Sequence, residues 1–291
     1  MRLHVRKSSR QANASIFPED LAAVYLAGLT EGVALVSSPL LPRLPCLQQE
    51  ETVVQGLSSI MAYVKEYQGS SLDASLSDLE LAKCTAYMAL LNEHAMTLYL
   101  ATYYMEREVF DNCTRPDLSH NIPFPFNYIR PLQLHSAAKK RLLDSRGWTG
   151  VSCEKSKEGL HERMQVEATA DELFSTFQNM MSGGSYIFGD IPSSLDLLLH
   201  AYLSLFKDAK SSVVGGVLHA RYHTLIEWTN ELQPIFASHA EIGTEESVVH
   251  ALRQHIHIDK DMLRKGVIVT SGIVAMVGYA LVSGRVKIRL A

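Results

Sequence analysis

The chain has 291 residues, of which 47% are hydrophobic and 20% charged, and its formal net charge is −4. This composition excludes a disordered chain and gives enough length for a sizeable core in one compact domain or two small ones. The weak negative charge argues against nucleic acid as a partner. The cysteines form no C-x-x-C pair, so we expect reduced thiols in a reducing compartment rather than disulfides or a zinc site. They are Cys46, Cys84, Cys113 and Cys153.

The first 66 residues alternate between strand and helix patterns. Pro18 lies where a helix can begin, and Pro45 opens a strand at a position that needs no amide donor. The predicted order is strand, helix, strand, proline-led strand and helix. These elements cover residues 2–5, 18–32, 33–36, 44–47 and 55–67, with the third strand beginning at 44–47.

Residues 67–240 predict a set of helices. Ser77 and Glu80 have the spacing of a capping box, and the helix that they open extends to about Phe110. Four prolines between residues 111 and 132 exclude one continuous helix there. Two more helices are expected over residues 162–181 and 217–237.

A second capping box lies at Ser193 and Asp196. The helix that follows, over residues 195–206, is apolar on almost every side, so it must be surrounded by protein. An ordinary helix start is the plain interpretation of the four-residue pattern taken alone.

The C-terminal region contains 19 consecutive residues without a charge, 266–284, which as a helix would be about 28 Å long. We predict a transmembrane tail anchor here, preceded by a linker or juxtamembrane helix over 241–265 and followed by a basic tail over 285–291. A buried core helix is the alternative. Representative anchor positions are Gly266, Ile273, Val277, Leu281 and Gly284, and the flanking basic residues are Lys265, Arg285 and Lys287.

The stretch Phe188-Gly-Asp-Ile-Pro-Ser-Ser-Leu-Asp196 resembles the signature that opens the buried helix of glutathione-transferase-like proteins, in its metaxin form. Leu44-Pro45 matches the proline before the third strand of that superfamily, which is usually cis. Residues 15–23 and 123–128 also resemble metaxin segments, the latter a fungal one. The resemblance implies an α+β fold with a thioredoxin-like domain over 1–66 and an all-helical domain over 67–240.

By this resemblance the chain is a non-enzymatic subunit of the mitochondrial outer-membrane sorting and assembly machinery. Its soluble domains would face the cytosol and support insertion and release of β-barrel precursors. The implied partners are an outer-membrane β-barrel assembly subunit, a second metaxin-like subunit, the precursor proteins and the lipid bilayer. No cofactor is expected.

The sequence also bears on enzymatic activity. After Val5, a hydroxyl is present at Ser8 but not in the local pattern of a glutathione transferase. The superfamily's acidic-or-Gln/Ser pair, which holds the γ-glutamyl group, falls on Gly56-Leu57, where neither side chain can bind a carboxylate. We therefore expect no catalytic residues. The alternative function is a tail-anchored glutathione-transferase-like enzyme of the same membrane.

One histidine stripe has a spacing that could hold a metal. His219, His223 and Glu227 lie four residues apart, but no second cluster completes the ligand set. We expect a solvated or packing stripe and no metal. The basic run at residues 139–141 is expected to be a solvated face.

Overall fold

The structure, a computed structural model, describes residues 1–8, 13–30, 32–38, 41, 43–68, 72–122, 126–148, 157–181, 185–237 and 242–244. Met1–Glu245 form one compact unit. The predicted anchor, its basic flanks and the basic tail lie outside the described residues, as does nearly all of the predicted linker. Within the described part of the chain, no helix is both long and apolar enough to span a bilayer.

A mixed sheet organises the N-terminal part. Its strand order is β4-β3-β1-β2-β5, with β1 parallel to β2, β2 parallel to β5, and the β1–β3 and β3–β4 pairs antiparallel. The Leu44–Pro45 peptide bond before β3 is cis. The strands are β1 (Arg2–Val5), β2 (Ala34–Ser37), β3 (Cys46–Gln49), β4 (Thr52–Gln55) and β5 (Gly243–Thr244).

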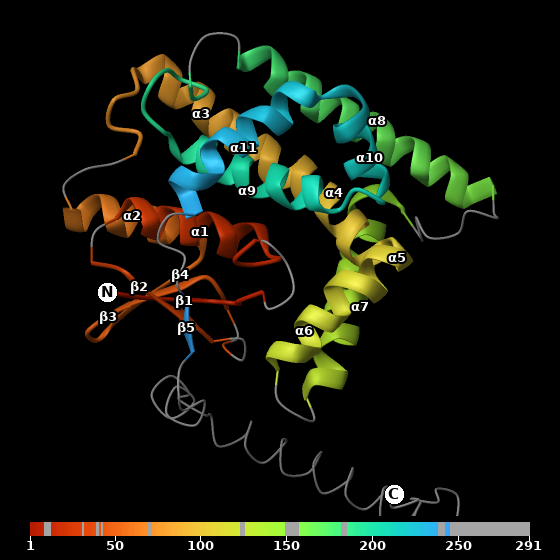
Figure 1. The fold of residues 1–291 in the computed structure, drawn as a ribbon, viewed down its shortest axis with the longest axis horizontal. Coiled ribbons are helices and arrows are strands. Elements are labelled where there is room, and N and C mark those ends of the chain that lie inside the picture. The colour runs from red at the N-terminus through yellow and green to blue at the C-terminus, as the bar shows by residue number, and fades with distance from the viewer. Residues whose placement is uncertain are drawn as a thin grey trace, which may run out of the picture. The chain divides into compact units, whose positions relative to one another are not determined.

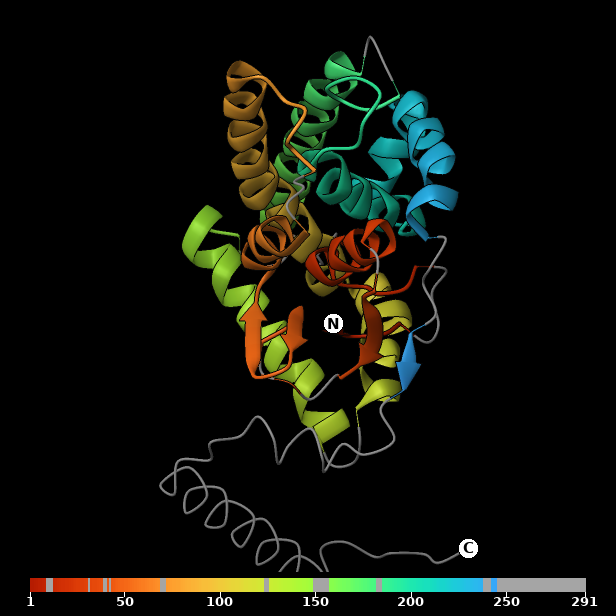
Figure 2. The same cartoon turned by 90° about the vertical axis from the view of Figure 1, so that its left-hand side faces the viewer.

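Two helices lie between this sheet and most of the later helices, as both ribbon views show (Figures 1 and 2). They are α1 (Pro18–Leu29) and α2 (Leu57–Gln68). Pro18 occupies the first turn of α1, where a missing amide costs no hydrogen bond. Nine of the twelve residues of α1 are buried, because the helix has protein on both sides. We call the sheet with α1 and α2 the sheet layer.

The helical layer contains all the later helices. Its first long helix is interrupted by π-helical turns and ends at Met105, where Glu106 takes an extended backbone conformation. Its members are α3 (Asp78–Leu90), η1 (Leu91–Ala95), α4 (Met96–Leu100), η2 (Ala101–Met105), α5 (Arg107–Val109), η3 (Phe110–Thr114), α6 (Arg115–Asn121), α7 (Phe126–Arg146), α8 (Lys157–Met180), α9 (Ser194–Asp208), α10 (Val213–Arg221) and α11 (His223–Ala237).

Helix α9 forms the centre of the helical layer. Every residue from Ser194 to Phe206 is buried, which agrees with its uniformly apolar sequence. It packs against α1 of the sheet layer as well as against α10 and α11. A single hydrophobic core therefore runs through both layers.

Several element boundaries differ from the sequence prediction. Strand β4 was not predicted, although it pairs along its whole length with β3. Part of the predicted linker forms β5, which pairs with β2 from 200 residues away in the chain and so carries no local signal. The predicted helix 217–237 is two helices that break at Tyr222. Pro131 lies inside α7 rather than breaking it.

Candidate functional site

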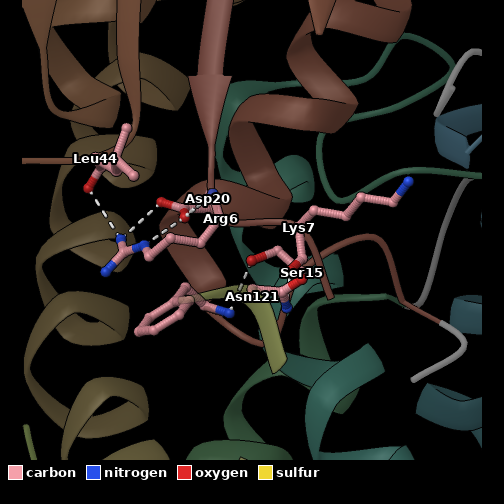
Figure 3. Close-up of polar contacts among 7 residues, drawn as sticks. Arg6, Lys7, Ser15, Asp20, Leu44 and Asn121 are labelled. Carbon is pink, nitrogen blue, oxygen red and sulfur yellow. Dashed lines mark hydrogen bonds and ion pairs between the residues drawn. The ribbon is translucent and has the colours of Figure 1, made fainter. Parts of the chain in front are cut away.

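The end of β1 is the position where a glutathione transferase would carry its catalytic hydroxyl or thiol. Here it carries Arg6, which forms a bidentate ion pair with Asp20 in α1 (Figure 3). The Nε–Oδ2 distance is 2.7 Å and the Nη2–Oδ1 distance is 2.8 Å. The backbone amide of Arg6 also donates to Asp20 Oδ2, at 2.9 Å. The Asp20 side chain is completely buried.

The Arg6 guanidinium makes two further contacts. Its Nη2 donates to the carbonyl oxygen of Leu44, the residue before the cis proline, at 3.1 Å (Figure 3). Its Cζ lies 3.6 Å from the centroid of the Phe17 ring, a cation–π distance. Burial acts to lower the pKa of Arg6, but the Asp20 carboxylate outweighs it and leaves the pKa raised. The arginine is therefore a permanently charged link between β1, α1 and the loop before β3.

The hydroxyl noted after β1 is also engaged in the structure. Ser8 Oγ donates to Asp117 Oδ1 of α6 at 2.9 Å, and both side chains are buried. Beside it, Asn121 Nδ2 donates to the Lys7 carbonyl oxygen at 2.7 Å (Figure 3). The segment after β1 thus attaches the sheet layer to α6.

A cleft of about 260 Å³ opens between the two layers, which we call the interlayer cleft. The first turn of α2 forms one wall, with Gly56 in a positive-φ conformation (φ 85°) that delivers the chain from β4 into the helix. The amide of Gly56 donates to the Pro45 carbonyl at 2.9 Å. The cleft is lined by Glu19, Gly56, Leu57, Ser58, Ser59, Met88, Asn92, Met96, Arg141 and Leu198.

The interlayer cleft has charges of both signs on its walls. Burial raises the pKa of Glu19, the neighbouring Asp20 raises it further, and Arg6 and Arg141 act in the opposite direction. The amides in the first turn of α2 add a partial positive charge on the other wall. Such a cleft can bind a small polar molecule, but none of its described lining residues is a cysteine, histidine or tyrosine. Its two serines have no histidine among the lining residues to act as a base.

The sequence pattern located Gly56 and Leu57 correctly at the entry to α2. It passed over Ser58 and Ser59, which directly follow Leu57 and also line the cleft, and over Glu19 and Arg141. The serines could have been found by counting hydroxyl residues in the first turn. Glu19 and Arg141 come from distant helices, so no local signal places them together.

The Ser193–Asp196 capping box begins α9. Ser193 N donates to Asp196 Oδ2 at 2.8 Å, Asp196 N donates to Ser193 Oγ at 3.4 Å, and Ile187 N donates to Asp196 Oδ1 at 2.9 Å. Burial raises the pKa of Asp196 while these hydrogen bonds act to lower it. The next amide, Ser194 N, donates to Asp73 Oδ1 at 2.8 Å, so two carboxylates cap this buried helix end. This arrangement is structural.

The Ser77–Glu80 capping box begins α3 on an exposed surface. Ser77 N donates to Glu80 Oε2 at 2.9 Å, and Glu80 N is 3.5 Å from Ser77 Oγ. The exposure separates this cap from that of α9, although the two sequence patterns look alike.

The histidine stripe does not make a metal site. His219 lies in α10 and His223 in α11, on either side of the break at Tyr222, and His219 Nε2 instead lies 3.0 Å from the Lys207 carbonyl oxygen. Among the residues that the structure describes, no cluster of histidine, cysteine or acidic side chains could hold a metal ion.

These features define a class of protein. A small mixed sheet, two helices on one face and a larger helical layer built around a capped, buried helix are consistent with the glutathione-transferase-like fold. In the catalytic position of that fold, this chain has an ion pair between the partly buried Arg6 and the buried Asp20.

Comparisons with known proteins show which proteins the chain is similar to. The Tom37 family model, described as an outer mitochondrial membrane transport complex protein, matches residues 33–135. Metaxin-3 of Xenopus laevis is 32% identical over 141 residues, which cover 47% of this chain and 43% of that protein. Human metaxin-1 is 27% identical over 224 residues, covering 75% of this chain and 46% of the relative. Human metaxin-2 is 24% identical over 161 residues, covering 55% and 57%.

These similarities support a member of the metaxin family. The chain spans less than half the length of the metaxin-3 and metaxin-1 proteins just named.

Proposed function

We propose that this protein is a non-enzymatic subunit of the mitochondrial outer-membrane sorting and assembly machinery. The observation that carries the proposal is the similarity to metaxins, together with the description of the matching family model as an outer mitochondrial membrane transport complex protein. In this role the chain supports insertion and release of β-barrel precursors. Its partners are an outer-membrane β-barrel assembly subunit and a second metaxin-like subunit.

The ion pair at the end of β1 supports a binding role rather than catalysis. A glutathione transferase needs a free hydroxyl or thiol at this position to stabilise the glutathione thiolate. Arg6 has no nucleophilic atom and is held by Asp20, the Leu44 carbonyl and the Phe17 ring. Ser8, the next hydroxyl along the chain, is hydrogen-bonded to Asp117.

The proposal includes a division into domains and a tether. A thioredoxin-like domain over residues 1–66 and a helical domain over 67–240 make the specific contacts on the cytosolic face. Residues 266–284 anchor them in the outer membrane and raise their local concentration at the complex. Deletion of residues 266–291 at low expression should then reduce complex assembly, and undiminished assembly would make the tether dispensable.

The main experiment is an affinity purification from digitonin-solubilised mitochondria, followed by mass spectrometry. We expect stoichiometric recovery of an outer-membrane β-barrel protein and a second thioredoxin-fold protein. The same preparation is passed over glutathione-agarose and assayed for glutathione conjugation, and we expect neither retention nor turnover. A chain that is purified alone, binds glutathione and conjugates a substrate would instead be the tail-anchored enzyme.

A further inference from the structure

Helix α7 presents an apolar strip on its outer face. Its other face packs into the protein through the buried residues Pro131, Ala138 and Leu142. Since successive residues turn by about 100°, the side chains three and fourteen positions after Ile129 lie within about 60° of its direction, on the same face of the helix. The strip consists of Ile129 (41% exposed), Leu132 (57%) and Leu143 (46%), with Phe126 (56%) at the start of the helix.

The strip lies on a predominantly basic helix. Helix α7 contains five Lys or Arg and one acidic residue, Asp144, in a chain whose net charge is −4. Lys139 and Lys140 are exposed on the same helix, about two turns beyond Leu132. An apolar strip bordered by lysines is the pattern of helices that lie at the surface of an anionic membrane.

The last described strand, β5, is linked to the end of α6, which precedes this helix in the chain. Lys7 Nζ donates to the Ile242 carbonyl oxygen at 3.2 Å, immediately before β5, the last described element. Asn121, at the end of α6 and five residues before α7, donates to the carbonyl oxygen of the same Lys7 (Figure 3). One residue thus connects β5 with the end of α6. In both ribbon views β5 and the end of α6 lie toward the lower end of Met1–Glu245 (Figures 1 and 2).

We propose that the outer face of α7 is a membrane-contacting surface, which rests its apolar strip in the headgroup region of an anionic bilayer. The inference depends on the proposed function for the presence of a membrane anchor. The 21 residues between Thr244 and Gly266 can span up to about 70 Å, so they allow α7 to reach the bilayer that holds the anchor. The lysines beside the strip favour an anionic lipid surface as its occupant. Arg130 and Arg141, which line pockets on the inner side, do not contribute.

The test uses the full chain reconstituted into vesicles, with an environment-sensitive fluorophore on one introduced cysteine. Cys113 and Cys153 are replaced by serine, and the buried Cys46 and Cys84 are left in place. The probes are Leu132→Cys and, as a second position on the strip, Ile129→Cys. Leu79→Cys on α3 is the matched control, because Leu79 is an equally apolar residue at 66% exposure. Val277→Cys reports the anchor separately.

We expect emission at positions 132 and 129 to rise several-fold on vesicles of phosphatidylcholine with phosphatidylinositol and to be quenched by brominated acyl chains. The emission at these positions should be lower with vesicles of pure phosphatidylcholine, in high salt, and in the double variant Lys139→Glu, Lys140→Glu. Each of these changes weakens the attraction to anionic headgroups. Position 79 should not respond.

The two proposals can fail separately. Quenching at 277 without a response at 129 and 132 would overturn the membrane-contacting surface and leave the anchor in place. Quenching at 129 and 132 but not at 277 would support the membrane-contacting surface and contradict the proposed anchor. If 132 is shielded only when an acidic partner protein is added, the occupant is a protein and the proposal is wrong. If none of these positions responds, both the membrane-contacting surface and the anchor are contradicted.

Discussion

At the scale of single residues, the Asp20 carboxylate joins α1 to the segment that follows β1. It accepts hydrogen bonds from the backbone amide, Nε and Nη2 of Arg6, and its side chain is completely buried. A buried pair of this kind contributes little net stability when intact, because desolvation offsets the attraction. Removal of one partner is costly, because the other charge remains in the interior.

Asp20→Asn should therefore destabilise the protein by roughly 3–5 kcal/mol. The matched control is Asp111→Asn, which breaks the exposed Arg107–Asp111 pair and should cost less than about 1 kcal/mol. Urea denaturation followed by far-ultraviolet circular dichroism measures both. Equal losses in the two variants would show that the Arg6–Asp20 pair has no special role.

Two buried titratable residues give opposite dependences of stability on pH. Burial lowers the pKa of His200 to about 4, although its Nε2 donates to the Thr229 carbonyl oxygen. The unfolded chain binds this proton more readily, so stability is lost as pH falls from about 6.5 toward 4. Burial raises the pKa of Glu106 to about 7, so its effect is reversed: stability falls as pH rises from about 4.5 to 7.

The variants His200→Gln and Glu106→Gln separate these effects. Compared with the unmodified protein, the melting temperature of His200→Gln should be increasingly lower as pH rises from 5 to about 7, because the variant lacks the stabilising increment. The melting temperature of Glu106→Gln should rise relative to that of the unmodified protein over the same pH range. Parallel shifts for the two variants would contradict these assignments.

At the scale of elements, the two capping boxes differ in what surrounds them. Glu80 caps α3 on the surface, where water can replace the lost hydrogen bonds. Asp196 is buried and also holds Ile187 N, so its removal leaves several amides without a partner in the interior.

We expect Asp196→Ala to cost about 3 kcal/mol, above the usual range for a cap, and Glu80→Ala about 0.5–1 kcal/mol. Thermal denaturation measures both. If Asp196→Ala kept its full stability but lost its partner in the affinity purification, the residue would serve recognition instead of folding.

The first turn of α10 contains two adjacent glycines, Gly215 and Gly216, that have different surroundings. A Cβ atom on Gly215 would lie 2.0 Å from the Ala209 carbonyl oxygen, whereas one on Gly216 would meet nothing within 4 Å. Gly215 is therefore required by the close approach of the preceding turn. Gly216 is only a weak helix former.

Gly215→Ala should destabilise the protein by more than about 2 kcal/mol, because a backbone segment must move. Gly216→Ala should stabilise it by up to about 1 kcal/mol, from helix propensity. Differential scanning calorimetry compares the two variants. A neutral Gly215→Ala variant would mean that the turn before α10 adjusts freely.

At the scale of the whole molecule, α1 of the sheet layer also packs against the helical layer. It packs on the sheet below and against α9 and α11 above, and Tyr25 stacks on Phe236 at a ring-centroid distance of 5.5 Å. Ser194, capped by Asp73, and Ser8, bonded to Asp117, make further links between the layers. The sheet layer therefore lacks an independent core.

We accordingly expect residues 1–245 to unfold in one transition. The fluorescence of Trp228, in the helical layer, and hydrogen exchange of the β1 amides, in the sheet layer, should give the same free energy of unfolding. A lower value for β1 would mean that the sheet layer opens independently.

Much of this architecture could be predicted from local pattern. Pro18, the Ser77–Glu80 and Ser193–Asp196 pairs and the apolar run of α9 each carry a signal within a few residues, and the corresponding helices begin where expected. The cis Leu44–Pro45 bond agrees with the superfamily pattern. The candidate site was only partly predictable, because Glu19, Ser58 and Arg141 come from three different helices.

The sequence by itself determined the mixed α+β class, the order of the main elements, the metaxin resemblance and the two capped helix starts, because each depends on neighbours along the chain. Tertiary structure alone decided that Arg6 pairs with Asp20, that β5 joins β2, and that α10 and α11 separate at Tyr222. Tyr222 shows the reason most directly: its hydroxyl donates to Asp171 Oδ1 of α8 at 2.8 Å, a contact 51 residues away in the chain. Contacts of that separation form only when the elements pack, so no local pattern specifies them.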